Sequence, residues 1–241
     1  MMRLIMVIAA VTALAAPAAA QDVAISFGNG ESLATRSVQL MVLVTVLSLV
    51  PGIAIMVTCF PFMVTVFAIL RQAIGLQQSP PNMLLVSLAL FLTYFVMEPV
   101  FTEAWTAGIE PLMNNQISIE EAFNLSIAPL RTFMIGRVDP DTFVALADIR
   151  PDVASSTAVD DAPLSILVPS FMLSEIARAF EVGFLIFLPF LIIDLVVAAV
   201  LMSMGMMMVP PAIVSLPFKL AFFVVADGWG LLAQSLVRSY F

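Results

Sequence analysis

Hydrophobic residues are gathered in long stretches along this 241-residue chain, and two of the stretches are almost free of charge. No charged side chain lies between Arg36 and Arg71, and Asp194 is the only charged residue from Val182 to Phe218. A helix as long as either stretch would exceed about 50 Å, whereas the hydrocarbon core of a bilayer is about 30 Å thick. Each stretch is therefore predicted to be broken rather than to cross a membrane as one straight helix.

Proline and glycine mark the expected breaks. Pro51-Gly52 and Pro61 lie inside the first stretch, and Gly205 with Pro210-Pro211 lies inside the second. Proline removes a helical hydrogen bond and clashes with the preceding turn, and glycine relaxes the backbone. We therefore expect the chain to bend or turn at these positions.

Each broken stretch is followed by another apolar one. Residues 83–101 follow the first stretch after a polar turn, and residues 212–237 follow the second. Consecutive apolar segments joined in this way are typical of helical hairpins in a membrane. The pattern predicts an all-α membrane protein with two broken hydrophobic helical hairpins, at residues 37–101 and 179–241.

The segment between the two hairpins is acidic. Residues 98–178 hold twelve acidic and four basic side chains, and so account for the net charge of −8 of the whole chain. Ser118 and Glu121 have the spacing of a capping box, and Asp139-Pro140 has the pattern of an N-cap followed by a first helical residue. We expect residues 102–178 to form a mostly helical, acidic, extracytoplasmic domain.

The N-terminus has the pattern of a secretory signal peptide. Residues 1–20 combine a basic start, a short apolar run and an alanine-rich end, with cleavage expected between Ala20 and Gln21. An uncleaved first membrane helix is the alternative. Cleavage would leave residues 21–36 as a short extracytoplasmic segment and would place the acidic domain in the periplasm. Arg71 would then lie on the cytoplasmic side, as the positive-inside rule requires.

The composition fits a membrane protein and excludes several kinds of chemistry. Hydrophobic residues make up 62% of the chain and charged residues only 11%, against about 25% charged residues in soluble domains. The chain has no histidine and one cysteine, Cys59, so the usual catalytic bases, zinc sites and intrachain disulfides are excluded. Its negative charge disfavours nucleic-acid binding. We expect no enzyme activity, no cofactor and no metal.

Several rigid motifs keep their order and spacing from about residue 37 to the C-terminus. They are Leu70–Gly75, Ser174-Glu175-Ile176, Pro189–Val196, Gly205–Pro211 and Leu216–Lys219. In these motifs the chain resembles the FliP family of flagellar biosynthetic proteins, which has a close paralogue in virulence secretion systems.

The resemblance implies a role in the flagellar type III protein export apparatus. It implies a multi-pass protein of the bacterial inner membrane at the flagellar basal body, in a ring of about five copies. With FliQ and FliR the ring would form the gate through which unfolded flagellar subunits pass, with FlhA and FlhB nearby and lipid around it. It also implies hairpins that lie partly above the membrane plane.

The methionines of the second break are the first candidate site. Met206, Met207 and Met208 form a run that the resemblance identifies as a pore gasket, with Gly205 and Pro210-Pro211 as the hinges of the loop. Methionine is unbranched and polarisable, so a ring of such side chains could close around different substrates. Packing in the core or against lipid is the alternative.

Three charged residues of the apolar segments need partners. Lys219 is the only lysine of the chain, and the resemblance pairs it with Glu175 of a neighbouring subunit. A lysine that reaches the membrane surface from a helix end is the alternative. Asp194 is read as a buried acid that fixes packing, with a proton-relay group as the alternative.

The sequence leaves three alternatives to a flagellar export gate. One is the virulence secretion paralogue, one is a proton-coupled small-solute transporter that uses Asp194, and one is a purely structural membrane scaffold. The chain also departs from the family where a hydroxyl residue and an arginine are usual, because Pro61 and Phe62 stand there. Any role of that arginine is not carried over to this chain.

Overall fold

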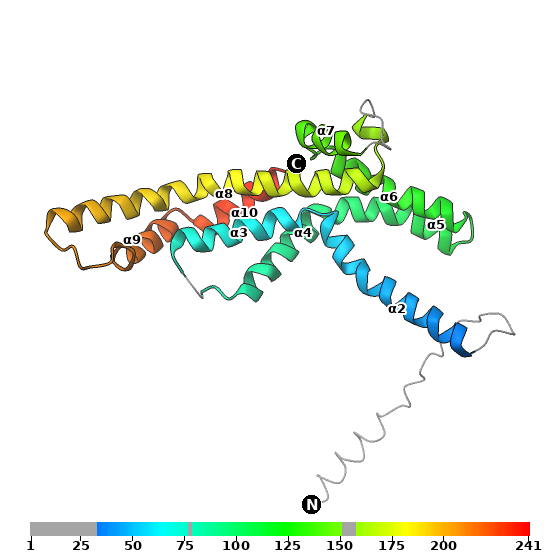
Figure 1. Ribbon diagram of the computed structural model, residues 1–241, viewed down its shortest axis with the longest axis horizontal. Coiled ribbons are helices and arrows are strands. Elements are labelled where there is room, and N and C mark those ends of the chain that lie inside the picture. The colour runs from blue at the N-terminus through cyan, green and yellow to red at the C-terminus, as the bar shows by residue number, and fades with distance from the viewer. Residues whose placement is uncertain (1–32, 77–78, 151–157) are drawn as a thin grey trace, which may run out of the picture. The chain divides into compact units, whose positions relative to one another are not determined.

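The computed structural model describes residues 33–76, 79–150 and 158–241, and in these ranges every regular element is a helix (Figure 1). The predicted signal peptide, its cleavage between Ala20 and Gln21, and most of the segment 21–36 lie outside the described residues. Packing divides the chain into two compact units, Met1–Leu47 and Ser48–Phe241. The packing described below belongs to the second unit.

The helices follow one another with short connections. In chain order they are α2 (Leu33–Met56), α3 (Phe60–Ile74), α4 (Asn82–Ala104), the π-helix η1 (Trp105–Ile109), α5 (Glu110–Met113), α6 (Ile119–Ile135), α7 (Pro140–Ile149), the 3₁₀-helix η2 (Val159–Asp161), α8 (Leu164–Ser203), α9 (Pro211–Val225) and α10 (Gly228–Arg238).

Three helical segments of the described chain are long and apolar enough to cross a membrane. They are Arg36–Met56, Asn82–Met113 and Leu164–Ser203. Helices α9 and α10 together make a fourth candidate, bent by 61° at the break between them. These helices confirm the prediction of an all-α membrane protein with several apolar segments.

The first stretch is broken next to Pro61 and not at Pro51-Gly52. Helix α2 continues through Pro51 and Gly52 to Met56, so these residues do not break it. The chain turns instead at Val57–Cys59, and Pro61 occupies the first turn of α3. Proline is tolerated there because the first helical N–H groups have no intrahelical acceptor. Pro61 thus starts a helix instead of bending one.

The second break lies where the sequence predicts it. Helix α8 ends at Ser203 and α9 begins at Pro211, with Gly205 in the left-handed region at φ 74°. The expected boundary between the acidic domain and the second hairpin, at residues 178 and 179, falls inside α8. No structural break marks this boundary, since one 40-residue helix carries both parts.

Both predicted helix caps of the acidic segment are present. The backbone N–H of Glu121 donates to Ser118 Oγ over 3.2 Å at the start of α6. The N–H of Thr142 donates to Asp139 Oδ2 over 2.8 Å at the start of α7. Hydrogen bonds from Thr142 lower the pKa of the exposed Asp139 carboxyl, because they favour its charged form. These local signals fix where the two helices begin.

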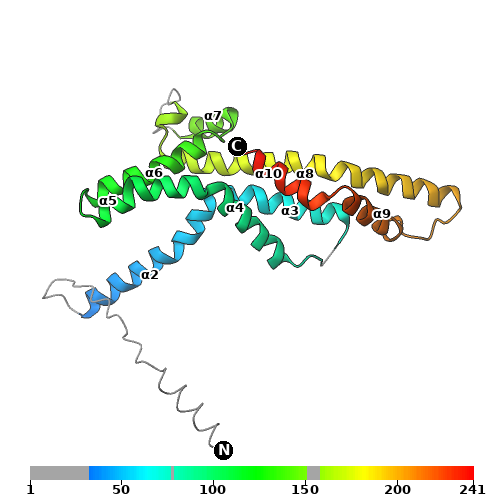
Figure 2. The ribbon, with the colours of Figure 1, turned by 180° about the vertical axis from the view of Figure 1, so that it is seen from behind.

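Helix α3 is the centre of the second unit. It packs along α8 and against α4, and Figures 1 and 2 show it beside α8 from both sides. Its buried residues are Pro61, Phe62, Met63, Val66, Phe67, Leu70, Ala73 and Ile74. Close approach to α8 depends on Gly183, where an added Cβ would lie 2.4 Å from the Ile69 side chain. The apolar core is therefore built around one short helix.

A second close approach joins η1 to α6. A Cβ added at Gly108 would lie 2.5 Å from the carbonyl oxygen of Ala122 and 2.9 Å from the backbone nitrogen of Ser126. Backbone atoms cannot move aside as a flexible side chain would. The glycine is thus required for α6 to lie against the end of α4.

Replacement of Gly108 by alanine is expected to lower the free energy of unfolding by about 1–3 kcal/mol, the usual cost of overpacking. The measurement is thermal unfolding of the purified protein in detergent. Gly52→Ala is the matched control, because nothing lies within 4 Å of an added Cβ at this helical position. Equal stability of the two variants would contradict the close approach at Gly108.

Candidate functional site

The loop between α8 and α9 carries the three methionines in an exposed position. Met206 is 41% exposed, Met207 84% and Met208 97%. Gly205 makes the turn possible, since its φ of 74° is unfavourable for other residues. The N–H groups of Gly205 and Met206 donate to the last carbonyls of α8, over 3.1 Å to Met202 and 3.0 Å to Leu201. The loop is thus anchored at its base while its tip is free of the chain's own core.

A small apolar cavity lies beneath this loop. Its volume is about 360 Å³, and it is lined by Ala198, Leu201, Met202, Met206, Met207, Val209 and Pro211. Unbranched methionine side chains can move into such space with little strain. The loop therefore combines an exposed apolar tip with room to deform.

Lys219 is buried and has two acceptors within its own chain. Its Nζ lies 2.6 Å from Asp194 Oδ2 on α8 and 3.1 Å from the carbonyl oxygen of Ala73 on α3. Ser215 Oγ donates to Asp194 Oδ1 over 2.5 Å. Lys219 is 6% exposed and Ser215 is fully buried. The Asp194 side chain, predicted to be buried, is 34% exposed in the single chain, so the ion pair joins a buried lysine to a partly exposed carboxylate.

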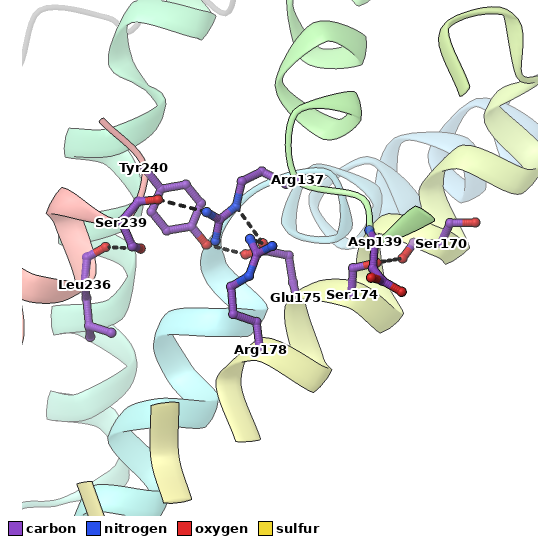
Figure 3. Close-up of polar contacts among 9 residues, drawn as sticks. All are labelled: Arg137, Asp139, Ser170, Ser174, Glu175, Arg178, Leu236, Ser239 and Tyr240. Atoms are coloured by element: carbon purple, nitrogen blue, oxygen red, sulfur yellow. Dashed lines mark hydrogen bonds and ion pairs between the residues drawn. The ribbon is translucent and has the colours of Figure 1, made fainter. Parts of the chain in front are cut away.

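Glu175 is the centre of a second polar cluster (Figure 3). Its carboxylate is fully buried and accepts a hydrogen bond from Arg137 Nε over 2.9 Å and another from the hydroxyl of Tyr240. Arg178 adds an ion pair at 3.6 Å. Arg137 comes from the turn between α6 and α7, and Tyr240 from the residues after α10. The cluster thus joins three parts of the chain.

Arg137 makes two more contacts with the C-terminal residues. Its Nη1 donates to the carbonyl oxygen of Ser239 over 2.8 Å, and its guanidinium lies 4.0 Å from the centre of the Tyr240 ring. Burial, reinforced by the Glu175 carboxylate, raises the pKa of Tyr240 far above the ordinary value of a phenol. The hydroxyl therefore remains protonated and keeps donating to Glu175.

Phe62 lies against this cluster. Its side chain is fully buried, and its ring meets the Tyr240 ring edge-on at 5.7 Å. Phe62 thus packs in the core and presents no charge to its surroundings.

The two residues predicted to pair between subunits have other partners in the chain. Lys219 contacts Asp194, and Glu175 contacts Arg137, Arg178 and Tyr240. A bond between Glu175 and Lys219 of neighbouring subunits stays a prediction, and it would have to displace these contacts. The sequence reasoning also missed Ser215. The one signal in the sequence was that Ser215 lies four residues before Lys219, which places both side chains on the same face of a helix.

The described residues contain no group of three or more acidic, cysteine or histidine residues placed to hold a metal ion. The polar clusters around Lys219 and Glu175 consist of ion pairs and hydrogen bonds within the chain. Together with the apolar helices, these clusters define the class of the chain: an all-helical membrane protein with a methionine-rich loop.

The comparisons identify the family. The model of the FliP family matches residues 43–236. A flagellar biosynthetic protein FliP of Caulobacter vibrioides is 53% identical over 98% of this chain and 90% of its own length. Those of Agrobacterium fabrum and Bacillus subtilis are 48% and 46% identical, over 100% and 86% of this chain and 100% and 93% of their own lengths. The chain belongs to the FliP family and is a membrane component of the flagellar protein export apparatus.

Replacement of Arg137 by methionine is expected to cost about 3–5 kcal/mol of stability, because it leaves the buried Glu175 carboxylate without its closest cation. Unfolding of the purified protein measures the loss. Arg238→Met, at an exposed position of α10, should change stability by less than about 0.5 kcal/mol. Adding Glu175→Gln to Arg137→Met should recover part of the loss, and failure to do so would argue against a charge effect.

Charge reversal of Lys219 is expected to abolish motility, and its rescue identifies the partner. Lys219→Glu places a carboxylate beside Asp194, so Asp194→Lys should restore part of the swimming in a strain that lacks the native protein. Swimming in soft agar is the measurement, with protein level followed by immunoblot. Rescue by Glu175→Lys in place of Asp194→Lys would support the pairing between subunits.

Proposed function

We propose that the chain is a core subunit of the flagellar type III export gate, in which a homo-oligomeric ring with FliQ and FliR forms the channel for unfolded flagellar subunits. Membership of the FliP family supports the flagellar assignment over the virulence paralogue, since the relatives at 46–53% identity are named as flagellar proteins. FlhA and FlhB are expected nearby. The observation that carries the channel role is the exposed Met206–Met208 loop.

The methionine loop is suited to a gate that closes around variable substrates. Three exposed thioether side chains in each copy, repeated around a ring, would form an apolar constriction that excludes ions. The cavity beneath the loop gives the side chains of Met206 and Met207 room to move when a polypeptide passes. Gly205 and Pro210-Pro211 serve as the loop's hinges in this proposal.

Large apolar surfaces of the described chain support assembly with other chains. In the apolar windows of α2 and α8, 0% and 11% of the residues are buried. Each of these helices needs lipid or a partner chain around it. A ring with FliQ and FliR would supply such partners. In such a ring, the hairpins could lie partly above the membrane plane and still have their apolar surfaces covered by protein.

The placement of Asp194 argues against a solute transporter. Its carboxylate is bound by Lys219 and Ser215 on α9, which is the environment of a packing residue. Lys219 is bound in turn to the Ala73 carbonyl of α3, so the contacts of Asp194 lead to the backbone of a neighbouring helix. The proposal therefore assigns Asp194 to packing. It also assigns residues 102–178 to the periplasm and assigns no catalysis to the chain.

Replacement of Met206, Met207 and Met208 by alanine is expected to raise ion leakage through the assembled complex. The truncated side chains no longer fill the constriction. The measurement is single-channel conductance in planar bilayers of the complex purified with FliQ and FliR. Native mass spectrometry of the same sample gives its copy number and partners.

The matched control carries three alanines at the exposed Met41, Met83 and Met113, outside the loop. Its conductance should equal that of the native complex. Unchanged leakage in the loop variant, in a complex of native composition, would rule out the methionine seal. A species without FliQ and FliR, or one that contains a single copy, would contradict the gate itself.

A further inference from the structure

Ser215 is a buried polar residue to which the proposed function assigns no role of its own. Its hydroxyl lies 2.5 Å from Asp194 Oδ1 and 3.3 Å from the carbonyl oxygen of Ala212 one turn earlier. The bond to Asp194 is much the shorter, and it joins α9 to α8. The hydroxyl is therefore directed at the other helix of the hairpin.

Ser215 and Lys219 hold the two oxygens of one carboxylate. They lie four residues apart on one face of α9, so both reach Asp194 from the same side. Lys219 takes Oδ2 at 2.6 Å and Ser215 takes Oδ1 at 2.5 Å. With both oxygens held, the Asp194 side chain is confined to one orientation.

The end of α3 completes the arrangement. Lys219 Nζ also donates to the carbonyl of Ala73 over 3.1 Å, one of the last carbonyls of α3, which have no intrahelical donor. A cation near a helix C-terminus is also favoured by the helix dipole. The same four residues thus tie α3, α8 and α9 together, and we call Ala73, Asp194, Ser215 and Lys219 the hairpin clamp.

The clamp lies at a similar distance from the methionine loop on both arms of the hairpin. Asp194 is nine residues before the end of α8, and Lys219 is eight residues after the start of α9. At about 1.5 Å per residue both arms are about 12–14 Å long. Between the clamp and the loop lies the 360 Å³ cavity, so the two arms are less tightly packed there.

We propose that Ser215 is a positioning residue, which acts through Asp194 and Lys219 to fix the two arms of the α8–α9 hairpin. With the arms fixed at the clamp, movement is confined to the loop beyond them. The benefit of fixed arms to a gate rests on the proposed function. The positioning of the arms by Ser215 does not, because it follows from contacts within the chain.

The test measures the distance between the two arms. Spin labels are attached to cysteines placed at Met202 and Ile213, which are 61% and 70% exposed and lie between the clamp and the loop. The only native cysteine, Cys59, is fully buried and should not be labelled. The complex is assembled with an excess of unlabelled copies, so that each ring carries at most one labelled chain.

A single narrow distance is expected for the native sequence, and Ser215→Ala is expected to broaden it. Ser215→Thr keeps a hydroxyl at the same position, so it should retain the narrow distance. An equally narrow distance in Ser215→Ala would overturn the inference, provided that the labelled complex is intact by size-exclusion chromatography.

A second background separates positioning from simple packing. In Asp194→Leu with Lys219→Met the ion pair is replaced by apolar side chains, which is often tolerated. Ser215→Ala should add no further broadening there, because the residue through which Ser215 acts is gone. The same added broadening in both backgrounds would contradict a positioning role.

The conductance of the complex distinguishes the inference from the gate proposal. If Ser215→Ala broadens the distance while the triple methionine variant does not leak, the clamp stands and the seal is wrong. If the triple variant leaks and the arm distance does not respond to Ser215→Ala, the seal stands and the clamp is wrong.

Discussion

The packing of α3 is the constraint on which the second unit depends. With 15 residues it is about 22 Å long, too short to cross a bilayer, yet it is the most completely buried helix described. Helix α8 packs along it and comes close at Gly183, where an added Cβ would meet Ile69, and α4 also packs against it. Its last turn offers the Ala73 carbonyl to Lys219. A short apolar helix can occupy this position because its neighbours, and not lipid, cover it.

The two buried charges of this apolar bundle, Glu175 and Lys219, each meet a counter-ion from another part of the fold. Glu175 of α8 meets Arg137 from the α6–α7 turn, and Lys219 of α9 meets Asp194 of α8. A buried charge without a partner would cost several kcal/mol, so each pair favours one arrangement of the helices that carry it. One pair therefore fixes the α6–α7 turn on α8, and the other fixes α9 on α8.

Local signals made part of this fold predictable. Ser118 and Asp139 cap helices as their spacing indicates, and Gly205 ends α8 at the methionine loop, because such signals act within a few residues. The closest charged partners, Arg137 for Glu175 and Asp194 for Lys219, were not predictable, since they lie 38 and 25 residues away and depend on which helices pack together. Pro51 does not end its helix, because a proline within an otherwise continuous apolar helix need not break it.

Phe62 shows how tertiary context gives a single residue its role. Its buried phenyl ring packs on Tyr240 and carries no charge. All of the donors and cations around Glu175 within the described chain come instead from Arg137, Arg178 and Tyr240. The Glu175 carboxylate therefore holds both the residues that follow α10 and the α6–α7 turn. The same buried charge thus links the position of α10 to that of the acidic segment.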